Sequence, residues 1–265
     1  MRKTYRHRSN REYWQARWES IGADKAMQRR DRYPLKYSDM IISEKKGRIL
    51  EAGCGAGRIL RAYHDAGHNI VGIDFIEGAV EKLRKTDASL QVETGDITQL
   101  QFADRSFRSV LAFGLYHNLN ETLDRAVAET YRVLEPGGWL CASFRSDNIQ
   151  NAIIDWLAEQ QEKERIDKPR VFHKLNLTKK EFADLLARHG FVVHQLYPVE
   201  NFPFLYKFKR FRAVSQKAFD EHHSRSAGYR LSPVGAMCQK MLIRLFPYQF
   251  CNVYVIIAKK PERAA

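Results

Sequence analysis

The sequence has no long hydrophobic run and few cysteines, and both shortages exclude whole classes of protein. No apolar stretch approaches the roughly 18 residues that a membrane-spanning helix needs. Segment 1–11 is polar and basic, so it lacks the apolar core of a secretory signal. The four cysteines lie far apart without a C-x-x-C pair, which argues against a zinc site and a disulfide framework. We therefore expect a cytoplasmic protein with reduced thiols and no metal site.

Acidic residues are scarce near both ends of the chain, which carries a net charge of +13. Residues 1–36 hold eleven Lys and Arg against four Asp and Glu, and residues 200–250 hold nine against three. The segment between them is nearly neutral. Basic flanks favour anionic partners such as phosphorylated substrates, nucleic acid or an acidic membrane surface. The alternative is a solvated surface that only aids solubility.

Between residues 46 and 198, apolar runs alternate with segments of helical periodicity, the pattern of a parallel sheet covered by helices. With one more strand near the end of the chain, the expected strands are Arg48–Ala52, Asn69–Asp74, Leu90–Thr94, Ser109–Phe113, Trp139–Phe144, Phe191–Tyr197 and Val253–Lys259. The expected helices are Arg58–Ala66, Glu77–Arg84, Leu123–Leu134 and Thr178–His189. This pattern predicts an α/β fold with a seven-stranded, mostly parallel, doubly wound sheet.

Two segments fall outside the alternation. Residues 1–45 read as helices rich in Tyr, Trp and Arg, and residues 199–250 read as a basic, aromatic, helical insertion. The α/β core then covers 46–198, and 251–265 supply the final strand and a tail.

The strongest motif is the run I-L-E-A-G-C-G-A-G-R at 49–58, an apolar strand followed at once by a glycine-rich turn into a helix. Such a turn lets the backbone approach a ligand closely, because it carries no side chains there. A dinucleotide fingerprint would need a glycine or alanine where Arg58 stands. The spacing is G-x-G-x-G instead.

This turn resembles the first motif of class I S-adenosylmethionine-dependent methyltransferases of the small-molecule type. The resemblance implies a Rossmann-like fold with S-adenosyl-L-methionine as cofactor. It implies that Glu51 helps to fix the amino group of the cofactor. The methionine part would lie against the turn formed by Gly53, Cys54, Gly55 and Gly57.

Further positions match the family in order. Asp74 ends the second strand about 20 residues after the turn, where a carboxylate can accept hydrogen bonds from both ribose hydroxyls. The resemblance places Phe75 on the adenine and Asp96 on the adenine amino group, with Ile97 offering a backbone amide. Phe113, at the end of the fourth strand, completes the expected cofactor site.

The match continues through the fourth and fifth strands. Residues 107–119 resemble the family's fourth strand and the turn after it, although Arg108 stands where the family usually has an aspartate. Residues 131–138 resemble the L-x-P-G-G turn before the fifth strand. Each match alone has an ordinary alternative, such as a turn former or a solvated strand end. Their joint order carries the assignment.

Methyl transfer needs an aligned nucleophile more than a dedicated base. His117 is the candidate base, because it follows the fourth strand at the edge where ligands collect, and packing against the cofactor is the alternative. Tyr13 and Trp14 each lie about one helical turn from Trp18 in the amino-terminal segment, which closes over the cofactor in related enzymes. Simple burial of these rings is the alternative.

Two sequence motifs that are absent from this chain limit the class of methyl acceptor. No D/N-P-P-Y/F sequence and no Pro-Cys pair follow the fourth strand, which argues against methylation of exocyclic base nitrogens and of pyrimidine carbon. The insertion is expected to cover the acceptor pocket. Phe204 and Phe208 would contact an apolar part of the acceptor or lipid, and Lys207, Lys209 and Arg210 would contact an anionic part of it.

We therefore expect a small or medium-sized acceptor, anionic or lipid-linked, and contact with the inner face of a membrane. The less favoured alternatives are an RNA methyltransferase and a non-catalytic cofactor-binding module.

Overall fold

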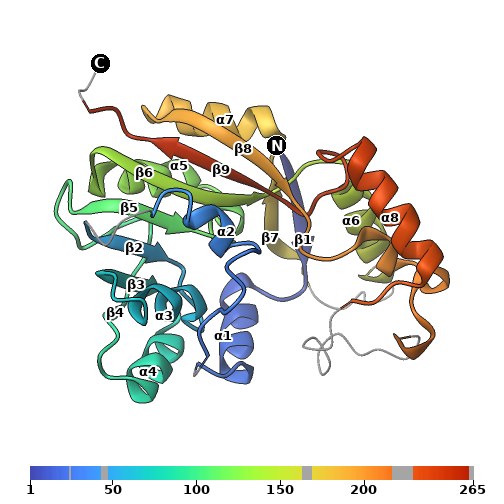
Figure 1. Cartoon of the computed structure of the whole chain (residues 1–265), viewed down its shortest axis with the longest axis horizontal. Coiled ribbons are helices and arrows are strands. Elements are labelled where there is room, and N and C mark those ends of the chain that lie inside the picture. Colours follow the sequence, from blue (N-terminus) through green and yellow to red (C-terminus); the bar gives the residue numbers. More distant parts are fainter. Residues whose placement is uncertain (24, 43–46, 163–168, 217–228, 263–265) are drawn as a thin grey trace.

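The computed structural model describes the chain except for residues 24, 43–46, 163–168, 217–228 and 263–265, so part of the expected lid, insertion and tail lies outside the described residues. The main sheet has seven strands in the order β4-β3-β2-β5-β6-β9-β8 (Figure 1). They are β2 (Ile49–Ala52), β3 (Ile70–Asp74), β4 (Val92–Thr94), β5 (Phe107–Ala112), β6 (Leu134–Arg145), β8 (Val192–Val199) and β9 (Val253–Lys259). Pairing is parallel from β4 through β6, and β9 runs antiparallel to β6 and β8. The predicted mostly parallel sheet is confirmed.

Helices cover both faces of this sheet, because successive residues of a buried strand point to opposite sides. On β2, Ile49 packs in a cluster with Leu60 of α3 (Arg58–His64). Leu50 belongs to a second cluster that contains Leu186 of α7 (Lys179–Arg188). The helices are α1 (Asn10–Ser20), α2 (Leu35–Ser38), α3 (Arg58–His64), α4 (Glu77–Thr86), α5 (Leu123–Val133), α6 (Ile149–Glu162), α7 (Lys179–Arg188) and α8 (Pro233–Leu245). All four predicted helices are present.

The amino-terminal segment contains a strand in addition to the expected helices. β1 (Arg2–Arg6) pairs antiparallel with β7 (Val171–Asn176) in a small second sheet. Neither strand was predicted, since their partners lie about 170 residues apart and neither segment shows a clear alternation of its own. The pairing brings the start of the chain beside the end of β6.

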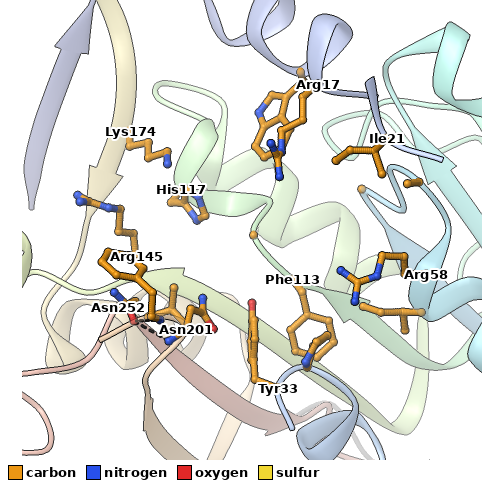
Figure 2. A pocket seen from close by; sticks show the side chains of 18 of the residues that line it. Arg17, Ile21, Tyr33, Arg58, Phe113, His117, Arg145, Lys174, Asn201 and Asn252 are labelled. Carbon is orange, nitrogen blue, oxygen red and sulfur yellow. Dashed lines mark hydrogen bonds between the residues drawn. The ribbon is translucent and has the colours of Figure 1, made fainter. Parts of the chain in front are cut away.

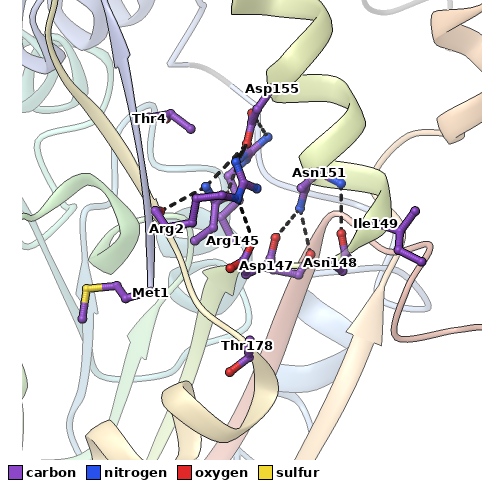
Figure 3. Close-up of polar contacts among 12 residues, drawn as sticks. Met1, Arg2, Thr4, Arg145, Asp147, Asn148, Ile149, Asn151, Asp155 and Thr178 are labelled. Carbon is purple, nitrogen blue, oxygen red and sulfur yellow. Dashed lines mark hydrogen bonds and ion pairs between the residues drawn. The ribbon is translucent and has the colours of Figure 1, made fainter.

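An ion-pair network holds this start in place (Figure 3). Asp155 of α6 accepts a bidentate pair from Arg145, with both N···O distances at 2.8 Å, and a further bond from Arg2 at 2.6 Å. Arg2 also donates to Asp147 at 2.8 Å. These side chains are partly buried, so the network joins β1, β6 and α6 more firmly than fully exposed pairs would.

The segment before the last strand begins with three short 3₁₀ turns, η2 (Phe204–Lys207), η3 (Lys209–Phe211) and η4 (Val214–Gln216), and continues in α8. The buried Gln239 of α8 accepts from the amide of Leu205 at 3.0 Å and donates to Glu200 at 2.7 Å. In the described parts of the chain, every helix is too short or too polar to cross a membrane.

Gly57 provides a test of the turn that opens α3. Its φ is +69°, and a Cβ atom there would lie 2.4 Å from Leu83 of α4. Gly57→Ala should therefore lower the free energy of unfolding by about 1–3 kcal/mol, measured by urea denaturation. Gly78→Ala, where a Cβ meets nothing within 4 Å, is the control and should be neutral or slightly stabilising. Equal effects of the two substitutions would contradict this account.

Candidate active site

The glycine-rich turn is clamped to the end of β3. The amides of Gly53 and Cys54 donate to the carbonyl of Ile73 at 2.8 and 2.9 Å, and the amide of Gly55 donates to Asp74 Oδ2 at 2.8 Å. Asp74 Oδ1 accepts from the amide of Ile76 at 3.0 Å. The buried Asp74 carboxylate thus has a structural role that sequence reasoning did not anticipate. Burial raises its pKa, while these amide hydrogen bonds lower it.

The first carboxylate of the motif lies below the turn and is poorly solvated. Glu51 is buried at the end of β2, and its Oε2 has no hydrogen-bond partner among the described residues. Burial raises the pKa of Glu51 well above its usual value, and the nearby Asp74 carboxylate raises it further. An unpaired buried carboxylate is costly unless a cation or a proton satisfies it. This site therefore fits the ammonium group of a ligand.

A cavity of about 340 Å³ collects the residues predicted to hold an adenosine. Asp74 and Phe75 reach it from the end of β3, and Asp96 and Ile97 reach it from the loop after β4. Phe75 is 38% exposed, so its ring is accessible for stacking by an adenine in this cavity. Asp96 Oδ1 accepts from the amide of Thr98 at 2.8 Å.

A larger cavity of about 550 Å³ adjoins it (Figure 2). Both cavities are lined by Trp14, Trp18, Gly53, Phe113 and Gly114, so they meet at the turn. The larger one also takes in four other predicted site residues: Tyr13, Glu51, Cys54 and His117. Together the two cavities could hold an elongated ligand with one end at Asp96 and the other near Glu51.

Two of the predicted glycines line neither cavity. A Cβ on Gly55 would lie 2.4 Å from the indole of Trp18, and one on Gly57 would meet Leu83. The absence of a side chain at Gly57 therefore serves packing between α3 and α4. At Gly55 it serves the approach of α1, whose Trp14 and Trp18 rings stack with centroids 5.2 Å apart.

His117 lies in the turn η1 (Tyr116–Asn118) at the carboxyl end of β5. It is buried, its ring packs edge-on against Phe144 at 6.0 Å, and its Nδ1 has no partner among the described residues. Burial lowers the pKa of His117 well below its usual value, and the charges of Lys174 and Arg145 lower it further. The imidazole is therefore neutral near pH 7 and able to accept a proton or a hydrogen bond.

Several lining residues escaped sequence reasoning. Tyr33 stands edge-on to Phe113 at 5.6 Å, and its hydroxyl lies 2.9 Å from Ser143 Oγ, which also accepts from the amide of Gly114. Lys174 reaches the cavity from β7 (Figure 2). Lys174 had no local signal because its strand was not predicted, and Tyr33 lies in an irregular segment.

The insertion contributes to the larger cavity through Asn201, Phe202 and Lys207. Phe204 does not reach it. Its ring is buried within the insertion, 5.4 Å from Phe208 and 5.6 Å from Phe250, so the expected contact of Phe204 with an acceptor or lipid is wrong.

Sequence comparisons show which known proteins this chain resembles. Residues 50–142 match a family described as a methyltransferase domain. A demethylmenaquinone methyltransferase of Renibacterium salmoninarum is 39% identical over 94 residues, which is 35% of this chain and 39% of that protein. A probable S-adenosylmethionine-dependent methyltransferase of Mycolicibacterium smegmatis is 28% identical over 159 residues, or 54% and 60% of the two chains. The chain thus spans between two fifths and three fifths of these relatives.

Solved structures share the fold at low identity. A methyltransferase from Methanosarcina mazei superposes with a TM-score of 0.58 at 17% identity, over 87% of this chain and 99% of that one. A putative methyltransferase from Bacillus halodurans gives 0.56 at 19% identity, over 85% and 97%. Residues 50–142 therefore match a methyltransferase domain, and the chain shares the fold of S-adenosylmethionine-dependent methyltransferases.

The residues of this methyltransferase domain fit its cofactor. S-adenosylmethionine carries an ammonium group, a ribose and an adenine. The ammonium would match Glu51, whose Oε2 has no partner among the described residues, the ribose would match Asp74, and the adenine would match Phe75 and Asp96. The bound sulfonium would supply an activated methyl group. The protein then has to hold an acceptor in line with that methyl and exclude water.

Glu51 provides the sharpest test of cofactor binding. Glu51→Gln should weaken S-adenosylmethionine binding about tenfold or more, measured by calorimetry, because a neutral amide loses the charge-assisted bond to the ammonium. The free energy of unfolding should change little, since Oε2 has no hydrogen-bond partner among the described residues and the amide oxygen of glutamine can still accept from the backbone of Leu60. 5′-Methylthioadenosine lacks the ammonium and carboxylate groups of the methionine part and should bind both proteins equally. An equal loss for both ligands would show that Glu51 only shapes the turn.

The neutral state of His117 predicts a pH-dependent stability. Its pKa is lowered on folding, so the unfolded chain binds a proton below about pH 6.5 that the native protein does not. Stability should therefore fall with pH below that value, by up to about 1.4 kcal/mol per pH unit for this group. Urea unfolding of the parent and of His117→Asn between about pH 7 and 5.5 measures the difference. Parallel pH profiles for the two proteins would refute a buried, neutral His117.

Proposed function

We propose that the protein transfers a methyl group from S-adenosylmethionine to a small or medium-sized acceptor with an anionic group and an apolar body. Lipid-linked acceptors, held at the inner face of a membrane, belong to this class. The observation that carries the proposal is the charge of the larger cavity.

Cations dominate the lining of that cavity. Its charged residues are the carboxylate Glu51 and the cations Arg17, Arg58, Arg145, Lys174 and Lys207. Glu51 lies at the turn, where the cofactor's ammonium would neutralise it. The rest of the lining combines aromatic rings, such as those of Tyr33, Phe113 and Phe202, with aliphatic side chains and the amides of Asn151, Asn201 and Asn252. An acceptor with a carboxylate or phosphate and an apolar body matches both parts.

The same cations bear on His117 as a base. Burial, and after it the charges of Lys174 and Arg145, lowers the pKa of His117 and makes it a weak proton acceptor. An anionic group bound between them would offset their charges and raise that pKa toward neutrality. The acceptor would thereby strengthen the base that takes its proton as the methyl group arrives. His117 lines the larger cavity, where the acceptor would lie.

Two flanking segments would close the site. We assign residues 1–45 as a lid, because Trp14 and Trp18 of α1 line both cavities. We assign residues 199–250 as an acceptor cap, because Asn201, Phe202 and Lys207 line the larger cavity. Closure by these rings excludes water, which strengthens every charge interaction inside.

The relatives' names support an acceptor with an apolar or carrier-bound part. They mention demethylmenaquinone, a malonyl-acyl carrier protein and a 24-methylenesterol. Lysine of a protein is also named among them, so the names do not select one acceptor.

A labelling experiment tests the acceptor class. Purified protein is incubated with methyl-labelled S-adenosylmethionine and, separately, with total RNA, extracted lipids and metabolites divided by anion exchange. Label should enter the anionic metabolites or anionic lipids. Label confined to RNA would establish the RNA methyltransferase alternative, and label confined to neutral compounds would overturn the anionic assignment.

Lys174 then tests recognition of the anion with the acceptor so found. Lys174→Gln should raise the acceptor KM about tenfold or more by removing a charge-assisted contact, and Lys174→Arg should retain most of the affinity. Cofactor affinity should be unchanged in both if Lys174 binds the acceptor, and a parallel loss of cofactor affinity would place Lys174 on the cofactor's carboxylate instead, since Glu51 lines the same cavity. An unchanged KM in Lys174→Gln would remove Lys174 from the acceptor site.

A further inference from the structure

The outer side of α8 exposes a row of apolar side chains. Val234, Met237, Met241 and Leu245 are 57% to 67% exposed. Their spacing of three and four residues places them on one side of the helix. The opposite side is buried: Gly235 faces the backbone of Phe211, where a Cβ would lie 2.6 Å from the carbonyl oxygen, and Gln239 is bonded inside the insertion.

The position of this row in the molecule leaves it uncovered by the described residues. Figure 1 shows α8 on the outside, at the end remote from β4. Phe246, directly after the helix, is 54% exposed and extends the row at its carboxyl end. A contiguous apolar strip of this kind on a surface helix is typical of an interaction site, because an ordinary amphipathic helix turns its apolar face inward.

The charge beside the row indicates what covers it. Lys240 and Arg244 are exposed on the same helix and flank Met237 and Met241 on one side. No Asp or Glu occurs anywhere from residue 222 to residue 261. Two copies of this surface brought face to face would oppose like cations without a carboxylate to pair them. The surface is instead complementary to a partner that is both apolar and anionic.

We propose that α8 binds the surface of an anionic lipid bilayer. The helix would lie parallel to the membrane plane, with Met237, Met241 and Leu245 inserted at the boundary between headgroups and acyl chains. Lys240 and Arg244 extend their charged ends to the lipid phosphates. A thirteen-residue helix with cations along one flank suits this interfacial position.

The membrane surface and the larger cavity share one structural unit. Gln239 of α8 binds the amide of Leu205 in η2, and η2 ends at Lys207 in the cavity wall. A protein held by α8 would therefore present the mouth of its acceptor cap close to the bilayer. This consequence rests on the proposed function, whereas binding of α8 to lipid does not.

Vesicle sedimentation tests the proposal on the full-length protein. The vesicles are phosphatidylcholine alone, or phosphatidylcholine with about 30 mol % phosphatidylglycerol. The parent should bind the anionic vesicles, with loss at high salt. Lys240→Glu combined with Arg244→Glu should weaken this binding roughly tenfold to thirtyfold, and Met237→Glu combined with Met241→Glu should weaken it at least as much.

Matched controls lie elsewhere on the surface. Lys85→Glu with Arg125→Glu changes the net charge equally on α4 and α5, and Met40→Glu changes an exposed methionine near α2. These variants should bind vesicles like the parent. Cofactor affinity and the unfolding midpoint should be parental in both α8 variants, which separates lost docking from lost folding.

Three outcomes would overturn the proposal: no binding of the parent to anionic vesicles at low salt, equal losses in the control variants, or a concentration-dependent dimer that the α8 substitutions abolish. A failure of methyl transfer with intact vesicle binding would refute the proposed function alone. Loss of vesicle binding with intact transfer to a water-soluble acceptor would refute the docking surface alone.

Discussion

The hydrogen bond from the amide of Gly55 to the buried carboxylate of Asp74 joins the two loops that define the site. It holds the end of β3 against the turn after β2, with the carbonyl of Ile73 accepting two more amides of the same turn. Because β2 and β3 are parallel neighbours, both loops leave the sheet at the same edge. The position of the smaller cavity, of Glu51 and of the ring of Trp18 above Gly55 all follow from this junction.

Two buried titratable groups then give the site its polarity. Burial raises the pKa of Glu51 and lowers the pKa of His117, because it disfavours the charged form of each side chain. In each case the surroundings disfavour the charged form until a partner of opposite charge arrives. In the proposed reaction, the cofactor's ammonium would suit the first group and an anionic acceptor the second, so that electrostatics would couple binding to chemistry.

The other residues that line the larger cavity come from parts of the chain that are far apart in sequence. Asp155 binds both Arg2 and Arg145, which fixes the pairing of β1 with β7 and so places α1 and Lys174 on one side of the larger cavity. The insertion closes another side through Lys207 and carries α8 on its outside. The insertion thus bears cations on two sides, with Lys207 in the larger cavity and Lys240 and Arg244 on the outside of α8.

The sequence by itself determined the sheet, its mostly parallel order and the identity of the residues at its carboxyl edge. Those features depend on local signals: apolar runs, the glycine spacing at 53–57, and a capping box in which Thr178 accepts from the amide of Glu181 at 3.2 Å. Only the tertiary structure decided which residues share a cavity. It placed Gly57 against Leu83, buried Phe204 inside the insertion, and brought Tyr33 and Lys174 into the site. These outcomes depend on contacts between residues far apart in the chain, such as β1 with β7, and no local periodicity encodes such a pairing.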